Sequence, residues 1–340
     1  MQVVSPDLVK GKKVLLRFDI DVPIQNGKVV DDFRLKAGLP TLKLCLENAE
    51  QVIIMGHIGR PGGREVLELS VEPIHDWLVE NDLRSHLSSG KLKLLENLRF
   101  EVGEEGCDLE YANKILKLAA SGEPRFQRVQ NDDDNLFYVN EAFAAHHPSA
   151  STTVLPTLLP HAVGLRFAEE VQKLTEVREN PERPLVVIIG GVKIEDKGPA
   201  IEAMSKIADT VLVGGKLASE LGQKYHDRDT NVLAGSLTED GMDISQKTVE
   251  EWEPIIRGAK MIVWNGPLGK VEEEKYSKGT EEIARAIIDS GAQSLIGGGD
   301  TIKVLNRLGI LEKFSFVSVG GGAMLKFLTE GTLATIKALD

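Results

Sequence analysis

The stretch that decides the fold of this 340-residue chain is Leu185 to Lys197, LVVIIGGVKIEDK. Its first five residues are apolar and mostly β-branched, which is typical of a strand buried on both faces of a parallel sheet. Gly190 and Gly191 end the strand and allow a ligand to come close to the main chain. Ligands of open α/β sheets bind at such strand-to-helix turns. Lys193 and Lys197 on this turn indicate a polyanion, although a surface turn with ordinary lysines fits this one segment equally well.

The same rhythm continues through the second half of the chain, where further apolar runs end in glycine-rich turns. These runs are Thr210 to Val213, Met261 to Val263, Ser294 to Ile296 and Ser315 to Val319. Strands that alternate with helices predict a parallel sheet covered by helices. Glycines at a helix start expose backbone N–H groups which, with the helix dipole, attract phosphate.

Asp300 follows the glycine triplet Gly297 to Gly299. It could cap the helix that begins there, or it could hold a Mg²⁺ ion that bridges nucleotide phosphates. Because a second triplet, Gly320 to Gly322, occurs in a similar position, we favour the metal.

The first half of the chain has four predicted strands, Val14 to Phe18, Gln51 to Met55, Leu92 to Leu95 and Leu136 to Val139. The basic side chains that follow them are Arg34, His57, Arg60, Arg99, His146 and His147, while Arg17 lies inside the first strand. Parallel sheets gather their carboxyl ends on one edge, and the guanidinium fork suits phosphate and carboxylate. One such arginine would be an ordinary surface residue, but a basic group after nearly every strand predicts an anion site.

Composition excludes several other classes of protein. The net charge is −12, which argues against binding nucleic acid or membranes through a broad basic surface. The two cysteines, Cys45 and Cys107, have no metal-ligand spacing and are expected to be reduced in the cytoplasm. The chain shows no signal peptide and no apolar run of membrane-spanning length. It also lacks the P-loop, the G-x-G-x-x-G fingerprint and the G-x-S-x-G nucleophile motif.

Domain organisation is predicted from a proline-rich and Ser/Thr-rich stretch at residues 148 to 165. We expect a first domain at 1–160, a second at 161–330 and a tail at 331–340 that returns to the first. A helix from about Gly164 to Glu179 would join the two. A basic crevice in one half and a glycine-rich, lysine-bearing crevice in the other suit phosphoryl transfer between an anionic small molecule and a nucleotide.

Nine motifs that run in order along nearly the whole chain resemble phosphoglycerate kinase. They are VLLRFDIDVP, DDFRLKAGLPT, GHIGRPGG, LLENLRF, VNEAF, GGVKIEDK, VWNGPLG, IGGGDT and VGGGA. The resemblance implies an α/β protein of two Rossmann-like domains, each a parallel sheet flanked by helices, joined by a hinge helix. It also implies a cytoplasmic, monomeric enzyme that interconverts 1,3-bisphosphoglycerate and ADP with 3-phosphoglycerate and ATP, using Mg²⁺.

The resemblance further implies roles for individual residues. Those that would hold 3-phosphoglycerate are Asp19, Asp21, Arg34, His57, Arg60, Arg99 and His147. Those that would hold the nucleotide are Lys193, Lys197, Gly215, Asn265, Glu272, Gly298, Gly299, Asp300 and Thr301, with Glu272 on the ribose and Asp300 on the metal. Those that would neutralise the moving phosphoryl group are Arg34, Lys193, Lys197, Gly320, Gly321 and Gly322.

Three features depart from the family pattern. Asp21 stands where the motif has Asn, and Pro148 stands in a segment that usually reads H-R-x-H. The region from about Asp227 to Glu253 is shorter than usual, with Asp243 to Ser245 in place of D-I-G-P. Two alternatives to an active phosphoglycerate kinase therefore stay open at this point: a kinase for another small carboxylate, and a catalytically weak nucleotide-binding protein.

Overall fold

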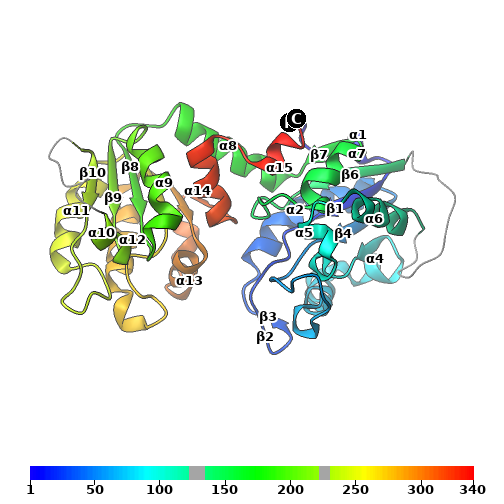
Figure 1. Ribbon diagram of the computed structural model, residues 1–340, viewed down its shortest axis with the longest axis horizontal. Coiled ribbons are helices and arrows are strands. Elements are labelled where there is room, and N and C mark those ends of the chain that lie inside the picture. The colour runs from blue at the N-terminus through cyan, green and yellow to red at the C-terminus, as the bar shows by residue number, and fades with distance from the viewer. Residues whose placement is uncertain (122–134, 222–229) are drawn as a thin grey trace. The chain divides into compact units, whose positions relative to one another are not determined.

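The computed structural model describes residues 1–121, 135–221 and 230–340 and divides the chain into two compact units (Figure 1). The first unit comprises Met1–Val171 and Leu333–Asp340, and the second comprises Gln172–Thr332. The two chain termini lie close together on the first unit, where the Met1 amino group is 3.7 Å from Asp340 Oδ1. Each unit is an α/β structure built on its own parallel sheet.

The sheet of the first unit has the order β5-β4-β1-β6-β7, with every neighbouring pair parallel. Its strands are β1 (Lys13–Arg17), β4 (Gln51–Met55), β5 (Leu92–Leu94), β6 (Leu136–Asn140) and β7 (His161–Val163). The helices of this unit are α1 (Pro6–Val9), α2 (Phe33–Asn48), α3 (Glu72–Leu78), α4 (Arg84–Ser88), α5 (Val102–Glu105), α6 (Leu109–Ser121), α7 (Leu155–Leu158) and α15 (Ala334–Lys337). The chain adds strands on one side of β1 and then crosses to the other side with β6, so a topological switch point lies beside β1.

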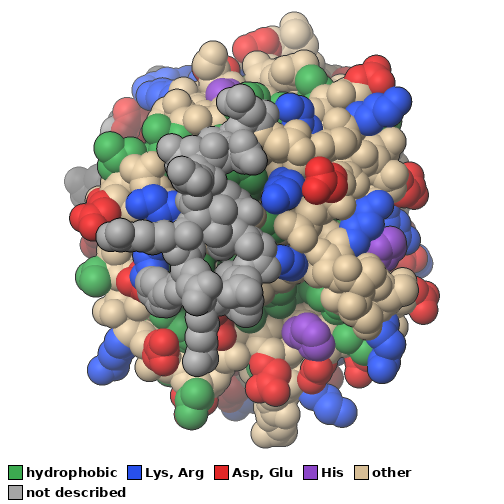
Figure 2. All heavy atoms as spheres, turned by 90° about the vertical axis from the view of Figure 1, so that its right-hand side faces the viewer, with side chains coloured by type: hydrophobic (Ala, Val, Ile, Leu, Met, Phe, Trp, Pro, Cys, Tyr) green, Lys and Arg blue, Asp and Glu red, His purple; other side chains and the backbone are tan. Residues whose placement is uncertain are grey.

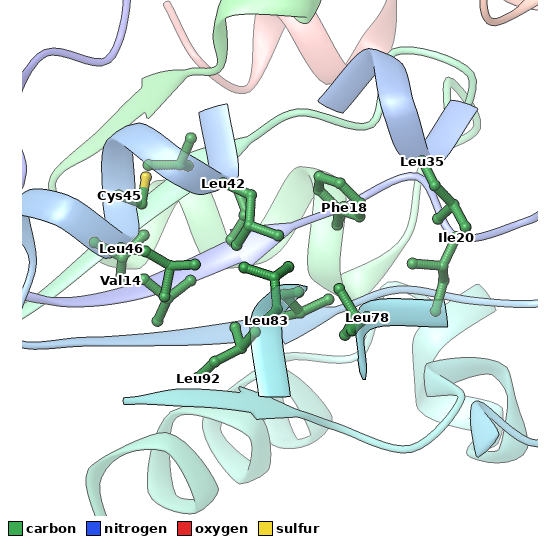
Figure 3. Close-up of a cluster of buried hydrophobic side chains, with 14 of the residues drawn as sticks. Val14, Phe18, Ile20, Leu35, Leu42, Cys45, Leu46, Leu78, Leu83 and Leu92 are labelled. Atoms are coloured by element: carbon green, nitrogen blue, oxygen red, sulfur yellow. The ribbon is translucent and has the colours of Figure 1, made fainter. Parts of the chain in front are cut away.

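The core of the first unit lies between this sheet and its helices (Figure 3). Phe18, just after β1, packs near Leu42 of α2 in a cluster of fully buried side chains. Gly38 permits the close approach of α2, because a Cβ there would lie 2.4 Å from the Phe18 ring. The Asn26-Gly27 pair forms the turn of the hairpin of β2 (Ile24–Gln25) and β3 (Lys28–Val29), with positive φ at both turn residues.

The sheet of the second unit has the order β10-β9-β8-β11-β12-β13, the doubly wound order of dinucleotide-binding folds. Its strands are β8 (Leu185–Ile189), β9 (Thr210–Val213), β10 (Val232–Ala234), β11 (Met261–Asn265), β12 (Gln293–Gly297) and β13 (Phe316–Val317). The helices are α9 (Ile194–Ser205), α10 (Lys216–Glu220), α11 (Gln246–Gly258), α12 (Lys278–Ser290), α13 (Gly299–Arg307) and α14 (Gly321–Glu330). The switch point lies between β8 and β11, next to the turn that follows β8 at Gly190 and Gly191. The predicted Rossmann-like α/β class is confirmed for both sheets.

The structure corrects the position of the domain boundary. Residues 161–163, which we expected in the second domain, form β7 and pair with β6 in the first sheet. The first unit continues to Val171, inside α8 (Leu165–Glu179). The stretch 148–165 therefore contains short helical turns and an edge strand. The boundary between the two units lies inside α8.

The start of α8 is capped by a buried side chain from the end of β6. Glu141 accepts the backbone N–H groups of Arg166 and Phe167, each at 3.2 Å, and Thr41 Oγ1 accepts that of Leu165 at 2.8 Å. Gly164 makes room, because a Cβ there would collide with the Glu141 carboxylate. Burial raises the pKa of Glu141 to about 8, although the hydrogen bonds from Thr41 and the helix backbone lower it.

This pKa predicts how stability depends on pH. Between the ordinary value of 4.5 and about 8, the unfolded carboxyl binds fewer protons than the folded one. The free energy of unfolding therefore falls as pH rises, by at most about 1.4 kcal/mol per pH unit. Glu141→Gln removes this dependence, so its stability relative to wild type should increase from pH 5 to pH 8 in urea unfolding. The matched control is Glu179→Gln at the exposed end of α8. The prediction would be contradicted if the difference in free energy of unfolding between Glu141→Gln and wild type changed with pH no more than it does for the control.

Candidate active site

The carboxyl edge of the first sheet brings together the acidic and basic residues that follow β1 and begin α2. Arg34 Nη1 donates to the main-chain oxygen of Asp21 at 2.7 Å and lies 3.8 Å from Asp19 Oδ1. Asp19 is buried, and its other oxygen, Oδ2, has no hydrogen-bond partner among the described residues. An acceptor held in this way beside a guanidinium group is suited to a ligand that carries a hydroxyl group.

The loops after β4 and β5 join this group of residues. Asp21 Oδ1 accepts the N–H of Gly59 at 2.9 Å, and Arg99 Nη1 donates to the Gly59 oxygen at 2.8 Å. Asn97 ties the two loops together, donating to the Ile58 oxygen at 2.8 Å and accepting the N–H of Arg99 at 3.1 Å. The segments after three neighbouring strands are therefore bonded into one surface.

The electrostatics of this surface are dominated by arginine. Burial lowers the pKa of His57 well below its ordinary value, and nearby arginines lower that pKa further: Arg17, Arg99, Arg34 and Arg60. Burial also raises the pKa of Asp19, against the effect of Arg34. Figure 2 shows basic and acidic side chains interspersed over one face of this unit.

Two predicted substrate residues lie at the surface. Arg60 is exposed, and its charge acts on His57. His147 is also exposed, and its ring centroid lies 4.2 Å from that of His146. The hydrogen bonds described above join Asp19, Asp21, Arg34 and Arg99 into one group but do not include His147.

In the second unit, Lys197 lies over the switch point between β8 and β11. Its Nζ donates to the main-chain oxygen of Gly190 and to Asn265 Oδ1, at 2.5 and 3.2 Å. Asn265 is buried, and its Nδ2 donates to the Gly321 oxygen at 3.0 Å. One lysine and one asparagine thus connect the ends of two central strands to the start of α14.

Glycines make these close approaches possible. A Cβ on Gly266 would lie 2.2 Å from the Gly190 oxygen and 2.3 Å from Lys197 Nζ. A Cβ on Gly215 would lie 2.7 Å from the Gly191 oxygen, and one on Gly321 would lie 2.4 Å from the Gly298 nitrogen. Any side chain at these positions would push the backbone segments apart. Gly215, Gly266 and Gly321 thus leave bare backbone at the carboxyl edge of the sheet, and we call this surface the glycine floor. A polyphosphate can approach it closely.

The starts of α13 and α14 complete this edge. Gly298 is the N-cap of α13 and has φ 101°. Asp300 lies in the first turn of that helix, where it pairs with Lys303 at 2.9 Å, so the alternative that Asp300 caps the helix is wrong. Thr301 is buried, with an Oγ1 that has no hydrogen-bond partner among the described residues. Gly320 to Gly322 lie at the N-terminus of α14.

Comparison with known proteins agrees with this geometry. The sequence model of one protein family, described as Phosphoglycerate kinase, matches residues 5–226 and 223–331. The chain is 33% identical over 396 residues to "Phosphoglycerate kinase" of Solibacter usitatus, covering 98% of this chain and 97% of that protein. It is 34% identical over 408 residues to "Phosphoglycerate kinase" of Sterkiella nova, with the same coverage.

The chain belongs to the phosphoglycerate kinase family.

Two solved phosphoglycerate kinase structures share its fold. That from Coxiella burnetii superposes with a TM-score of 0.79 at 27% identity, covering 98% of this chain and 97% of that one. That from Pyrococcus horikoshii gives a TM-score of 0.80 at 26% identity, covering 100% and 98%. The family resemblance found in the nine motifs is confirmed. Membership identifies the chain as a nucleotide-binding kinase of glycolysis whose phosphoryl acceptor is a carboxylate.

One segment that departs from the phosphoglycerate kinase pattern, Asp243 to Ser245, has a clear structural role. Asp243 is buried, and its two oxygens accept the N–H groups of Ile244 and Gly279, both at 2.9 Å. Ser245 caps α11 by accepting the Thr248 N–H at 3.2 Å. Asp243 borders a pocket of about 560 Å³, which Ile244 and Tyr276 also line. Residues 227–229 of the shortened region lie outside the described residues.

Three buried polar residues adjoin the predicted substrate residues of the first unit, and sequence reasoning assigned none of them a role there, although it showed Arg17 inside a strand. Arg17 is fully buried and donates to Ser151 Oγ at 2.9 Å, and Ser151 Oγ donates to buried Glu104 at 2.5 Å. An arginine within an otherwise apolar strand was the available signal for Arg17. Its partners, 87 and 134 residues further along the chain, have no local sequence signal.

The remaining predicted residues of the second unit are exposed. Lys193 occupies the N-cap position of α9, and Glu272 lies on the loop after β11. Neither is among the residues that the hydrogen bonds of Lys197 and Asn265 join. None of the helices in the described parts of the chain combines the length and apolar character needed to span a bilayer.

Proposed function

We propose that the chain catalyses reversible phosphoryl transfer between 1,3-bisphosphoglycerate and ADP, giving 3-phosphoglycerate and ATP, with the acid held by the first unit and the nucleotide by the second. We assign the acid to the first unit and the nucleotide to the second because the two sheet edges offer different chemical groups. The edge of the first sheet offers guanidinium groups around Asp19 and His57, whereas that of the second offers bare backbone and Lys197.

In the first unit, the anionic groups of the acid would be bound by arginine forks, which donate two hydrogen bonds at once. The residues in this role are Arg34, Arg60 and Arg99, with His57 and His147 as further donors. Asp19 Oδ2, which accepts no hydrogen bond from any described residue, would accept one from the hydroxyl of 3-phosphoglycerate. Asp21, already bonded to Gly59, would shape the loop that carries His57.

In the second unit, the nucleotide phosphates would lie over the glycine floor, near the N-termini of α13 and α14. The residues assigned to the nucleotide are Lys193, Lys197, Gly215, Asn265, Glu272, Gly298, Gly299, Asp300 and Thr301. Glu272 would bind the ribose hydroxyls. The buried Thr301 hydroxyl, which has no hydrogen-bond partner in the part of the chain that the structure describes, and the positive-φ Gly298 fit a site built around a ligand.

Phosphoryl transfer would depend on positioning and charge neutralisation. The acceptor carboxylate is ionised near neutral pH, so no general base is needed. Arg34, Lys193 and Lys197, with the N–H groups of Gly320, Gly321 and Gly322, would stabilise the charge on the moving phosphoryl oxygens. A hinge motion would bring the two substrates into contact and exclude water.

A Mg²⁺ ion fits the residues at the start of α13. Magnesium is commonly held by one or two carboxylates together with phosphate oxygens and water. Asp300 provides an exposed carboxylate next to the glycine turn. It forms a surface ion pair with Lys303, and a metal ion can displace the lysine because such pairs are weak. Magnesium, when bound, would neutralise phosphate charge. We also propose that the enzyme acts as a monomer in the cytoplasm.

A single coupled assay tests the proposal. Purified protein is supplied with 3-phosphoglycerate and Mg-ATP, and formation of 1,3-bisphosphoglycerate is followed through its enzymatic reduction. Turnover that depends on both substrates and is lost on addition of a chelator is the expected result. If 3-phosphoglycerate is inert while another small carboxylate is phosphorylated, the proposed substrate is wrong. Calorimetry that shows binding of Mg-ATP but not of 3-phosphoglycerate would instead indicate a decayed acid site.

A further inference from the structure

Arg17 is a buried cation whose three kinds of N–H group all have defined acceptors. It is the last residue of β1 and is 1% exposed. Nε donates to Ser151 Oγ at 2.9 Å, Nη1 donates to the Phe18 oxygen at 2.9 Å, and Nη2 lies 2.7 Å from His57 Nδ1. These contacts fix the plane of the guanidinium group, and its burial keeps it from contact with substrate.

The contact with His57 determines where the imidazole carries its proton. A guanidinium group has donors and no acceptor, and it stays protonated in proteins. His57 Nδ1 must therefore present its lone pair to Arg17. A neutral imidazole has one N–H, so in His57 that hydrogen is on Nε2.

The surroundings of His57 favour the same form. His57 is 8% exposed, and Arg17, Arg34, Arg60 and Arg99 place positive charge around it. Asp21 is the acidic group facing the ring, with Oδ2 3.8 Å from Nε2. Burial and these arginines lower the pKa of His57 well below its ordinary value of 6.5. The Asp21 oxygen accepts rather than donates, so it is compatible with a hydrogen on Nε2.

We propose that Arg17 is a positioning residue that holds His57 as a neutral imidazole with its hydrogen on Nε2, so that His57 serves the anionic substrate as a directed hydrogen-bond donor and not as a cation. The identity of that substrate rests on the proposed function, whereas the tautomer does not. The positive charge of the site then comes from the arginines alone.

The site also contains the counter-charge that a buried Arg17 requires. Glu104 is 1% exposed and accepts both the Ser151 hydroxyl at 2.5 Å and the Ser151 N–H at 3.0 Å. The Ser151 hydroxyl accepts from Arg17 while it donates to Glu104, so it links the two charges. The link to Ser151 and Glu104 holds Arg17 through Nε. Nη2 is therefore left to contact His57.

Nitrogen NMR on the wild-type enzyme tests the proposal without any variant of Arg17. Two-bond proton–nitrogen spectra of ¹⁵N-histidine-labelled protein distinguish the two ring tautomers, and the His57 signals are assigned by their loss in His57→Gln. The expected pattern is that of the Nε2–H tautomer, unchanged from pH 8 to pH 5.5. A hydrogen on Nδ1, or a titration near pH 6.5, would overturn the proposal even if the enzyme is fully active.

Kinetics provide the second test, because glutamine can place a neutral N–H where Nε2–H lies. We expect His57→Gln to keep KM for 3-phosphoglycerate within about threefold of wild type, and His57→Ala to raise it about tenfold. The double variant Arg17→Gln/Glu104→Gln removes both buried charges and should raise KM for 3-phosphoglycerate. When these two changes are combined with His57→Ala, KM should be no higher than in His57→Ala alone. The exposed Arg84→Gln is the matched control. Equal defects in His57→Gln and His57→Ala, or additive effects of the Arg17 and His57 changes, would contradict a role of Arg17 through His57.

Discussion

Replacement of Lys197 by alanine is expected to reduce kcat by about 10²- to 10³-fold in both directions of the reaction. Lys197 is the cation that lies over the β8–β11 switch point, bonded to the Gly190 oxygen and to Asn265. Removing one preorganised group that stabilises transition-state charge typically costs 10²- to 10³-fold. Alanine here also removes the ammonium group that would contact the phosphates in the ground state.

The Lys197 prediction has two matched variants. Lys206→Ala removes an exposed lysine at the other end of α9, where it pairs with Glu202 at 3.5 Å, and it should leave kcat unchanged. Lys197→Arg keeps the charge but should remain strongly impaired, because Gly190, Gly191 and Gly266 closely surround the ammonium group. Steady-state kinetics with both substrates saturating provide the measurement. A Lys197→Ala enzyme within tenfold of wild type would exclude Lys197 from the chemical step.

Replacement of Arg34 by alanine is expected to reduce kcat/KM for 3-phosphoglycerate by about 10²- to 10³-fold, with KM for Mg-ATP little changed. The expectation combines the loss of a charge-assisted bond to substrate with the loss of the positive charge 3.8 Å from buried Asp19. Arg34→Lys should recover part of the activity, because lysine keeps the charge but not the planar fork.

The control for Arg34 lies on the same helix. Lys36→Ala removes an exposed lysine that pairs with Asp32 at 3.1 Å, and it should leave both Michaelis constants unchanged. Thermal unfolding of each variant separates loss of function from loss of fold. A rise in KM for Mg-ATP as large as the rise for 3-phosphoglycerate would contradict the assignment of the two substrates to different units.

The sequence alone was sufficient where the signal is local. Strands β4, β8 and β9 have the predicted bounds, because a run of apolar, mostly β-branched residues ends at glycine or at a polar turn. The alternation of strands, glycine turns and helices predicted parallel sheets covered by helices, and the ordered motifs indicated the family and with it the Rossmann-like domains. Lys197 was selected as a lysine on the turn after an apolar run, whereas Asn265 and the individual glycines were assigned through the family resemblance.

Tertiary structure decided what depends on partners distant in the chain. Strands β7 and β10 have three residues each, too few for a periodic pattern, and they are strands only because a neighbouring strand offers its backbone hydrogen bonds. The domain boundary moved into α8 for the same reason. The tautomer of His57 depends on Arg17, 40 positions away, and the placement of Arg17 depends on Ser151 and Glu104. Hydrogen-bond direction is set by which groups fold together, and that information is not contained in any one segment.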